Sequence, residues 1–300
     1  MTERPERAAP FVCWLAAIAL VLAGVVGFGS WGMARSEAAR RSMLADIPTV
    51  LASVPPPAAR REAVVVILGD SLARCAIDDE DGWSRDLSAL LKRKARVVVI
   101  AQGRLSFEDL EPVSSRLVAL DPDLLLVQQE LLQQQSRPDA ATFAKNLVAA
   151  TRHFFAEAVR GEEIAEQGNT PQSPLMRCLV PRSHIGVETV SKRAADYYRK
   201  PNLSHSAADF LRTARARGIK VAVLELERAP AVEAHVHTLV ASWREQVLEP
   251  LAASGLFPVW HIEGPRDDAS YIDHSHLNST GRRLTRRRMV PMLADALETR

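Results

Sequence analysis

The sequence predicts an α/β domain with a doubly wound, three-layer parallel sheet of the flavodoxin-like kind, preceded by one apolar helix. Between short, mainly apolar runs, leucine, valine and alanine recur at helical spacing. Strands that alternate with helices in this way form a parallel sheet covered on both faces, and such strands are apolar along their whole length. The runs that predict strands are residues 64–68, 96–101, 124–127, 220–224 and 256–262.

The N-terminal part predicts a membrane anchor. Residues 11–29 carry no charge, and this segment is long enough to cross a bilayer as a helix. We place a tail at 1–10, the transmembrane helix at 11–31 with Trp14 and Trp31 near its ends, and a Pro-rich tether at 32–62. A cleaved signal peptide is the alternative. The basic residues on the two sides are nearly balanced, so charge leaves the orientation open.

Residues 63–300 form the predicted globular domain. An insertion or lid is expected at about 161–203, where Gly, Pro, Gln and Asn interrupt the alternation. Pro291 should kink or interrupt the final helix. The predicted helices are 83–94, 107–120, 140–160, 206–217, 232–252 and one that begins near Ser279.

Composition narrows the class of protein. With 47% apolar and 25% charged residues the chain is ordinary for a globular protein, and a net charge of +2 argues against a nucleic-acid binder. Three cysteines without a Cys-x-x-Cys fit neither a disulfide scaffold nor a zinc site, and we expect no metal or other cofactor. Cys75 and Cys178 can pair if the domain lies outside the cytoplasm, and two buried free thiols are the alternative.

Two short motifs carry the predicted chemistry. Ser71 follows the first strand, in Gly-Asp-Ser, and ligands of parallel sheets bind beyond the carboxyl ends of the strands. Asp273 and His276 precede the last helix and are three residues apart, so one turn can supply a base and the group that orients it. His274 is an alternative base. The Ser71 N–H would point toward a bound oxyanion.

These motifs resemble the first and last blocks of the SGNH or GDSL hydrolases, with Ser71 in the place of the nucleophile and Asp273 and His276 in those of the family's Asp and His. The resemblance spans about 63–298. It implies that Gly103 is an oxyanion donor.

The third block of the family departs from the pattern. Where Gly-x-Asn-Asp is usual, residues 130–133 read Glu-Leu-Leu-Gln, with Leu132 in the asparagine's place by count. The resemblance therefore implies that Gln129 or Gln133 supplies the third oxyanion donor, or that this donor is missing.

The resemblance implies a serine esterase or O-acyltransferase that acts on an ester, above all an O-acetyl group of an envelope polysaccharide or glycoconjugate, beside a membrane-bound O-acyltransferase. A single-pass anchor in the inner membrane with a periplasmic or extracellular domain fits this role. A lysophospholipase-type esterase and a catalytically decayed scaffold or polysaccharide-binding protein are the alternatives. A domain that faces the cytoplasm is a third possibility.

The last predicted helix also carries a basic cluster. Its interpretation is either a solvated face or a contact with anionic lipid or an acidic polymer. The cluster consists of Arg282, Arg283, Arg286, Arg287 and Arg288.

Overall fold

The computed structural model describes residues 8–102, 105–133, 178, 186–199, 202–254 and 257–299. The chain divides into two compact units, and the unit that contains 45–135 and 172–300 holds the whole sheet. The helix predicted at 140–160 and most of the predicted insertion lie outside the described residues.

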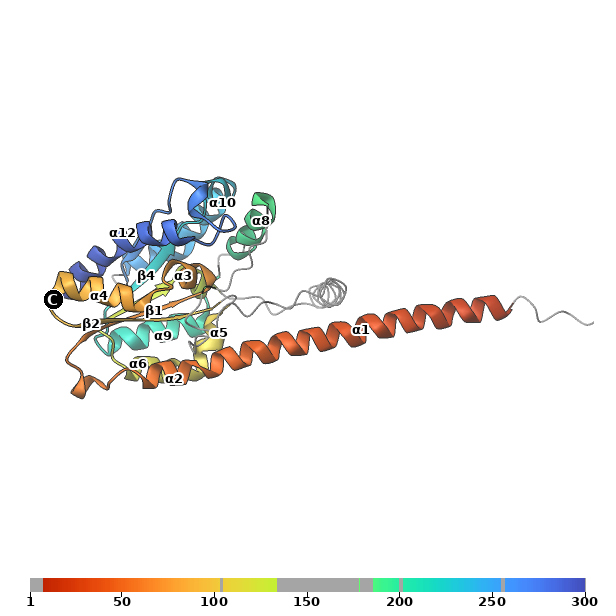
Figure 1. Cartoon of the computed structure of the whole chain (residues 1–300), viewed down its shortest axis with the longest axis horizontal. Helices are drawn as coiled ribbons and strands as arrows, with labels where there is room; N and C mark the ends of the chain where they lie inside the picture. Colours follow the sequence, from red (N-terminus) through yellow and green to blue (C-terminus); the bar gives the residue numbers. More distant parts are fainter. Residues whose placement is uncertain are drawn as a thin grey trace, which may run out of the picture. The chain divides into compact units, whose positions relative to one another are not determined.

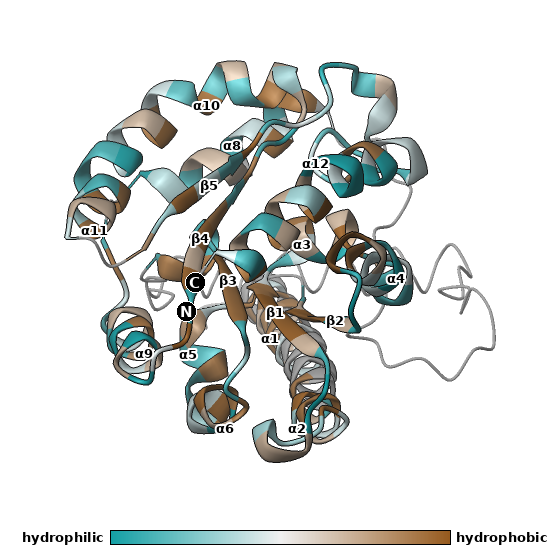
Figure 2. Cartoon of the chain, turned by 90° about the vertical axis from the view of Figure 1, so that its left-hand side faces the viewer, coloured by the Kyte–Doolittle hydropathy of each residue, from teal (hydrophilic) through white to brown (hydrophobic). Residues whose placement is uncertain are grey.

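Five parallel strands form one sheet in the order β2-β1-β3-β4-β5. Figure 1 labels the elements, and Figure 2 looks along the strands from another side. This order is the flavodoxin-like one, whose switch point lies between β1 and β3, so the predicted fold class is confirmed. The strands are β1 (Ala63–Gly69), β2 (Ala95–Ala101), β3 (Leu124–Gln128), β4 (Val221–Leu226) and β5 (Val259–Ile262).

Helices cover both faces of the sheet (Figure 2). On one face lie α3 (Ser71–Ala76), α4 (Glu80–Leu91) and α12 (Ser279–Glu298). On the other lie α5 (Phe107–Leu110), η3 (Glu111–Val113), α6 (Ser114–Ala119) and α9 (His205–Ala216). The helix predicted at 232–252 is divided into α10 (Pro230–Trp243), a π-helical turn η6 (Arg244–Leu248) and α11 (Glu249–Ala253). Shorter elements are α2 (Ile47–Ala52), η2 (Pro57–Ala59), η4 (Gln129–Leu132), α8 (Val187–Tyr198) and η7 (Asp268–Ser270).

The interior strand β1, which pairs with β2 and β3, is buried along its whole length. Val65 and Ile67 belong to the core that α3, α4 and α12 close, together with Trp83 and Leu293. The alternate side chains of β1 point to the opposite face and are also fully buried. Each buried valine or isoleucine contributes about 1.5–3 kcal/mol of transfer free energy. The nucleophile candidate therefore follows the most constrained strand of the sheet.

The predicted tether is wrong in part. Helix α1 (Ala8–Ala45) continues well past residue 32, and α2 follows it directly. Ile47 and Leu51 of α2 are buried, as is Val54, so the globular core begins earlier than predicted. Their i, i+4, i+7 spacing is that of a helix with one apolar face, which the prolines nearby obscured.

The interruption predicted for the last helix is wrong. Pro291 lies inside α12, which continues to Glu298 without interruption. A proline in a helix costs about 3 kcal/mol, but Met289, Leu293 and Leu297 bury the face of α12 around it and outweigh that cost. The predicted insertion contains α8, which packs against α10 and buries Tyr198.

Most of the basic cluster on α12 is used inside the molecule. Arg282 pairs with Asp78, and the Arg286 Nη1 lies 3.0 Å from Asp79 Oδ2. The Arg288 guanidinium donates to the main-chain oxygens of residues 263 and 264. Because Asp78 and Asp79 connect α3 to α4, these ion pairs join the start of α12 to the segment after the nucleophile candidate.

Helix α1 contains a segment, Cys13–Trp31, that is apolar and long enough to cross a membrane. Trp14 and Trp31 are exposed on it, at 70% and 49%. This assignment rests on the length and apolar composition of the segment, and a signal sequence has a similar length and composition.

Candidate active site

Ser71 is the first residue of α3, at the turn where β1 ends. Asp70 caps the helix, since its Oδ1 accepts the Leu72 N–H at 2.8 Å. Gly69 makes the turn possible: a Cβ at this position would overlap Ala73 and lie 2.6 Å from the Oε1 of Gln128. The end of β1 can therefore lie close to both Ala73 and Gln128 and place the Ser71 hydroxyl at the carboxyl edge of the sheet.

The segment between η7 and α12 presents Asp273 and His276. An isolated bridge between Tyr271 and Leu277 closes this loop, and the Ile272 N–H donates to the His276 main-chain oxygen at 2.7 Å. Asp273 Oδ1 accepts the main-chain N–H of His276 at 2.9 Å and that of Ser275 at 3.2 Å. The carboxylate is therefore fixed by the backbone that it orients.

The three predicted residues meet. His276 Nε2 lies 2.9 Å from Ser71 Oγ, across a sequence separation of 205 residues. On the other side of the ring, His276 Nδ1 lies 2.8 Å from Asp273 Oδ1. A carboxylate partner fixes the proton on Nδ1, so Nε2 is left as the acceptor for the serine proton.

Electrostatics favour an ionised Asp273. Burial raises the pKa of this carboxyl. The hydrogen bond and charge of His276, together with the two main-chain donors, lower it by more, so the pKa lies below its ordinary value. The charged carboxylate is thus available to stabilise an imidazolium at neutral pH.

His274, the alternative base, occupies a different environment. Its backbone has a φ of 64°, and its main-chain oxygen accepts the Ala229 N–H at 2.8 Å. Within the described residues, its Nδ1 is buried without a hydrogen-bond partner. The contact with Ser71 belongs to His276.

The candidate oxyanion donors differ in their surroundings. The Ser71 N–H precedes the first intrahelical hydrogen bond of α3, which Arg74 donates to Asp70, and so points out of the helix end. Gly103 lies outside the described residues. Gln129 donates one of its two Nε2 hydrogens to the Tyr198 hydroxyl at 2.9 Å, so its amide is already held in place. Gln133 is buried, and in the described part of the chain its Nε2 has no partner.

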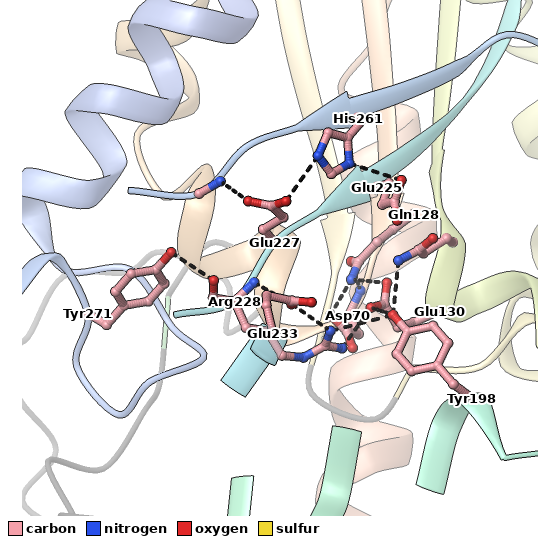
Figure 3. A network of polar contacts seen from close by, with 12 residues as sticks. Asp70, Gln128, Glu130, Tyr198, Glu225, Glu227, Arg228, Glu233, His261 and Tyr271 are labelled. Atoms are coloured by element: carbon pink, nitrogen blue, oxygen red, sulfur yellow. Dashed lines mark hydrogen bonds and ion pairs between the residues drawn. The ribbon is translucent and has the colours of Figure 1, made fainter. Parts of the chain in front are cut away.

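A buried polar network lies behind the nucleophile turn (Figure 3). It contains Asp70, Gln128, Glu130, Tyr198 and Arg228, all at most 5% exposed. Burial, followed by the charge of Glu130, raises the pKa of Asp70 to about 6. This set is not predictable from the sequence, because Tyr198 and Arg228 come from segments remote from β3. The polar residues 128–130 at the end of an apolar strand were the available signal.

The fold and the site define a class: an α/β domain with a Ser-His-Asp arrangement at the carboxyl edge of its sheet. A 2-1-3-4-5 sheet with the serine after β1 and Asp-x-x-His before the last helix is the arrangement that the sequence resemblance implied. The chain therefore has a flavodoxin-like α/β fold with this arrangement of residues at the edge of its sheet.

No protein-family model and no curated protein matches the chain by sequence. Among solved structures, the lipase Lip_vut3 from a goat rumen metagenome is 10% identical with a TM-score of 0.38, over 79% of this chain and 100% of that chain. A G-D-S-L family protein from Desulfitobacterium hafniense is 10% identical with a TM-score of 0.40, over 77% and 99%. A family two carbohydrate esterase from Clostridium thermocellum is 12% identical with a TM-score of 0.35, over 78% and 64%. At these TM-scores, what these proteins do has no bearing on this chain, and the site rests on its own geometry.

Proposed function

We propose that this chain is a serine ester hydrolase or O-acyltransferase of the SGNH type. The observation that supports it most strongly is the continuous contact from Asp273 through His276 to the Ser71 hydroxyl, at 2.8 and 2.9 Å. A hydroxyl is a weak nucleophile until a base takes its proton, and this arrangement supplies the base in the required tautomer. The intact contact favours an enzyme over the decayed scaffold.

In the proposed reaction, Ser71 Oγ attacks the carbonyl carbon of an ester while its proton passes to His276 Nε2. The tetrahedral intermediate collapses, and His276 returns the proton to the departing alcohol. Water or a sugar hydroxyl, deprotonated by the same imidazole, then attacks the acyl-serine. The bond to Ser71 Oγ breaks, the imidazolium returns its proton to Oγ, and an acid or a new ester is released. Asp273 stabilises the imidazolium in both steps.

Gln133 is our candidate for the third oxyanion donor. Its buried Nε2 lacks a partner among the described residues, whereas the Nε2 of Gln129 is engaged by Tyr198. A buried N–H without an acceptor is costly in the resting state and becomes useful if an oxyanion forms beside it. Gln133→Leu should lower kcat by about 10²–10³-fold, as loss of one oxyanion donor does. Gln246→Leu, at an exposed glutamine on η6, is the control, and equal activity of the two variants would exclude Gln133.

The finer proposal concerns place and substrate. The apolar segment Cys13–Trp31 would anchor the chain in the inner membrane, and the disulfide between Cys75 and Cys178 favours a domain on the oxidising, periplasmic or extracellular side. A membrane-anchored esterase on that side meets envelope polysaccharides and glycoconjugates, and O-acetyl groups are the esters we propose that it transfers or removes. A membrane-bound O-acyltransferase is the proposed partner.

The test uses the detergent-solubilised full chain. Ser71→Ala should fold like the parent but lose both hydrolysis of an aryl acetate and labelling by a fluorophosphonate. Ser114→Ala, at a half-buried serine whose hydroxyl donates to the Glu111 main-chain oxygen at 2.8 Å, is the matched control and should keep both. Equal turnover by Ser71→Ala and the parent would remove the serine from the mechanism. A panel of acetylated polysaccharide and lysophospholipid then separates the proposed substrate from a lysophospholipase activity.

A further inference from the structure

The nucleophile turn rests on a glutamine of the neighbouring strand. Gln128, the last residue of β3, accepts the Asp70 main-chain N–H at 2.8 Å through its Oε1. Its Nε2 donates to Asp70 Oδ1 at 2.9 Å and to Glu130 Oε2 at 2.8 Å. One amide therefore holds both the backbone and the side chain of the residue before Ser71, and Glu130 fixes the orientation of that amide.

Glu130 in turn binds a buried arginine (Figure 3). Its Oε1 accepts from Arg228 Nη2 at 2.8 Å and from the Tyr198 hydroxyl at 2.7 Å. The side chains of Glu130 and Arg228 are only 1% and 4% exposed. Two charges so far from water are costly unless their geometry is well matched, so a pair of this kind fixes positions more than it adds stability.

The main chain beside Arg228 holds the loop that carries the base. The Arg228 oxygen accepts the Tyr271 hydroxyl at 3.1 Å, and the Ala229 N–H donates to the His274 oxygen at 2.8 Å. Tyr271 precedes Asp273 by two residues, and His274 lies between Asp273 and His276. Both contacts are therefore inside the loop that presents the imidazole.

These contacts form one path from the segment of the nucleophile to the segment of the base. We propose that Glu130 and Arg228 are positioning residues that set the distance between Ser71 Oγ and His276 Nε2. Glu130 acts through Gln128 on the turn before Ser71, and Arg228 acts through its backbone on the Asp273–His276 loop. This inference rests on the proposed function, and it gives a role to Glu130, which stands where the third block departs from the family's pattern.

The magnitude follows from the sensitivity of the reaction to distance. The hydroxyl and the imidazole meet at the carboxyl edge of the sheet, so a displacement of about 1 Å at either end of the path separates them and costs about 100-fold in rate. We assign no substrate contact to Glu130 or Arg228. The expected signature is a lower kcat with an unchanged KM.

The experiment compares two neutralised glutamates in the full chain. Glu130→Gln keeps the shape of the side chain but removes the charge that holds Arg228. Glu225→Gln is the control: this residue lies on β4 and is 3% exposed, against 1% for Glu130. It pairs with Arg244 and His261, which belong to neither catalytic segment. For each variant, kcat and KM for an aryl acetate, the rate of fluorophosphonate labelling and the melting temperature are measured.

The proposal predicts that Glu130→Gln lowers kcat and the labelling rate by about 100-fold at unchanged KM, whereas Glu225→Gln keeps both even if its melting temperature falls as far. Arg228→Gln should match Glu130→Gln, and the double variant should be no worse than either single one, because both interrupt the same path. If a single variant does not fold, the double variant, which removes both charges of the Glu130–Arg228 pair, decides alone.

Parental kcat in the folded single or double variants would overturn the positioning role, as would an equal loss in Glu225→Gln. A parent chain that neither hydrolyses the ester nor reacts with the fluorophosphonate would instead refute the proposed function. The two failures are thus distinguishable.

Discussion

Asp273→Asn tests the catalytic arrangement with the least disturbance of the loop. The asparagine oxygen can still accept the main-chain N–H groups of Ser275 and His276, at 3.2 and 2.9 Å in the parent. The substitution alters the contact with the imidazole of His276, because Asp273 Oδ1 and Oδ2 both lie within 3 Å of its Nδ1. An NH₂ group in place of one oxygen donates to Nδ1 and moves the ring proton to Nε2.

The size of the effect follows from that proton. With Nε2 protonated, the imidazole presents a donor to Ser71 Oγ, 2.9 Å away, and can no longer accept the serine proton. A wrong tautomer in a triad of this geometry costs about 10⁴-fold in kcat, or about 5 kcal/mol of transition-state stabilisation. The pKa of Asp273 lies below its ordinary value, so the parent carboxylate is charged at neutral pH and the whole effect should appear there.

The assay is hydrolysis of an aryl acetate at neutral pH, with circular dichroism to show that the variant is folded. Asp267→Asn is the control in the same loop, because an asparagine can replace its cap on the Ala269 N–H, at 2.9 Å in the parent. A folded Asp273→Asn variant with more than about a tenth of the parental kcat would refute the assignment of the tautomer.

Three further predictions concern stability. Asp70 has a pKa raised to about 6, so between about pH 4 and about pH 6 the folded state binds a proton that the unfolded state has lost. The free energy of unfolding should therefore fall by on the order of 3 kcal/mol as the pH rises from about 4 to about 6. In urea titrations the free energy of unfolding of Asp70→Asn should depend less on pH than that of the parent, and an equal dependence would show that Asp70 is not its source. Arg286→Gln should lower the free energy of unfolding by less than about 1 kcal/mol, less so in high salt, since its partner Asp79 is half exposed. Reduction of the disulfide between Cys75 and Cys178, which are 103 residues apart, should lower the free energy of unfolding by up to about 5 kcal/mol, and so lower the melting temperature. An unchanged melting curve would count against a closed loop of that length.

The catalytic candidates were predictable because each is marked by local pattern. Ser71 ends an apolar strand and begins a helix, and Asp273 and His276 are spaced for one turn. Strand order was also accessible, because alternating strands and helices restrict the topology to a few solutions. The meeting of Ser71 and His276 then followed from the shared edge of a parallel sheet.

The polar network was not predictable in the same way. Glu130 and Arg228 are 98 residues apart, and nothing in the sequence near either one indicates the other. A charged residue after a strand is usually solvated, and only tertiary packing buries these two. Tyr198 comes from α8, where the mixture of Gly, Pro and polar residues around it suggested a loop. Long-range satisfaction of buried charge is a property of the folded chain.

The place of β5 in the sheet has a consequence for how the protein fails. Ser71 follows a strand that is hydrogen-bonded on both sides. The loop with His276 follows β5, a four-residue strand that is largely half-exposed and that, in the part of the chain the structure describes, pairs with β4 alone. Short edge strands open locally before a domain unfolds as a whole. On warming, the imidazole side should therefore loosen first while the serine side persists. Catalysis would then disappear at a temperature where most of the helical signal remains, and recover on cooling without refolding of the centre.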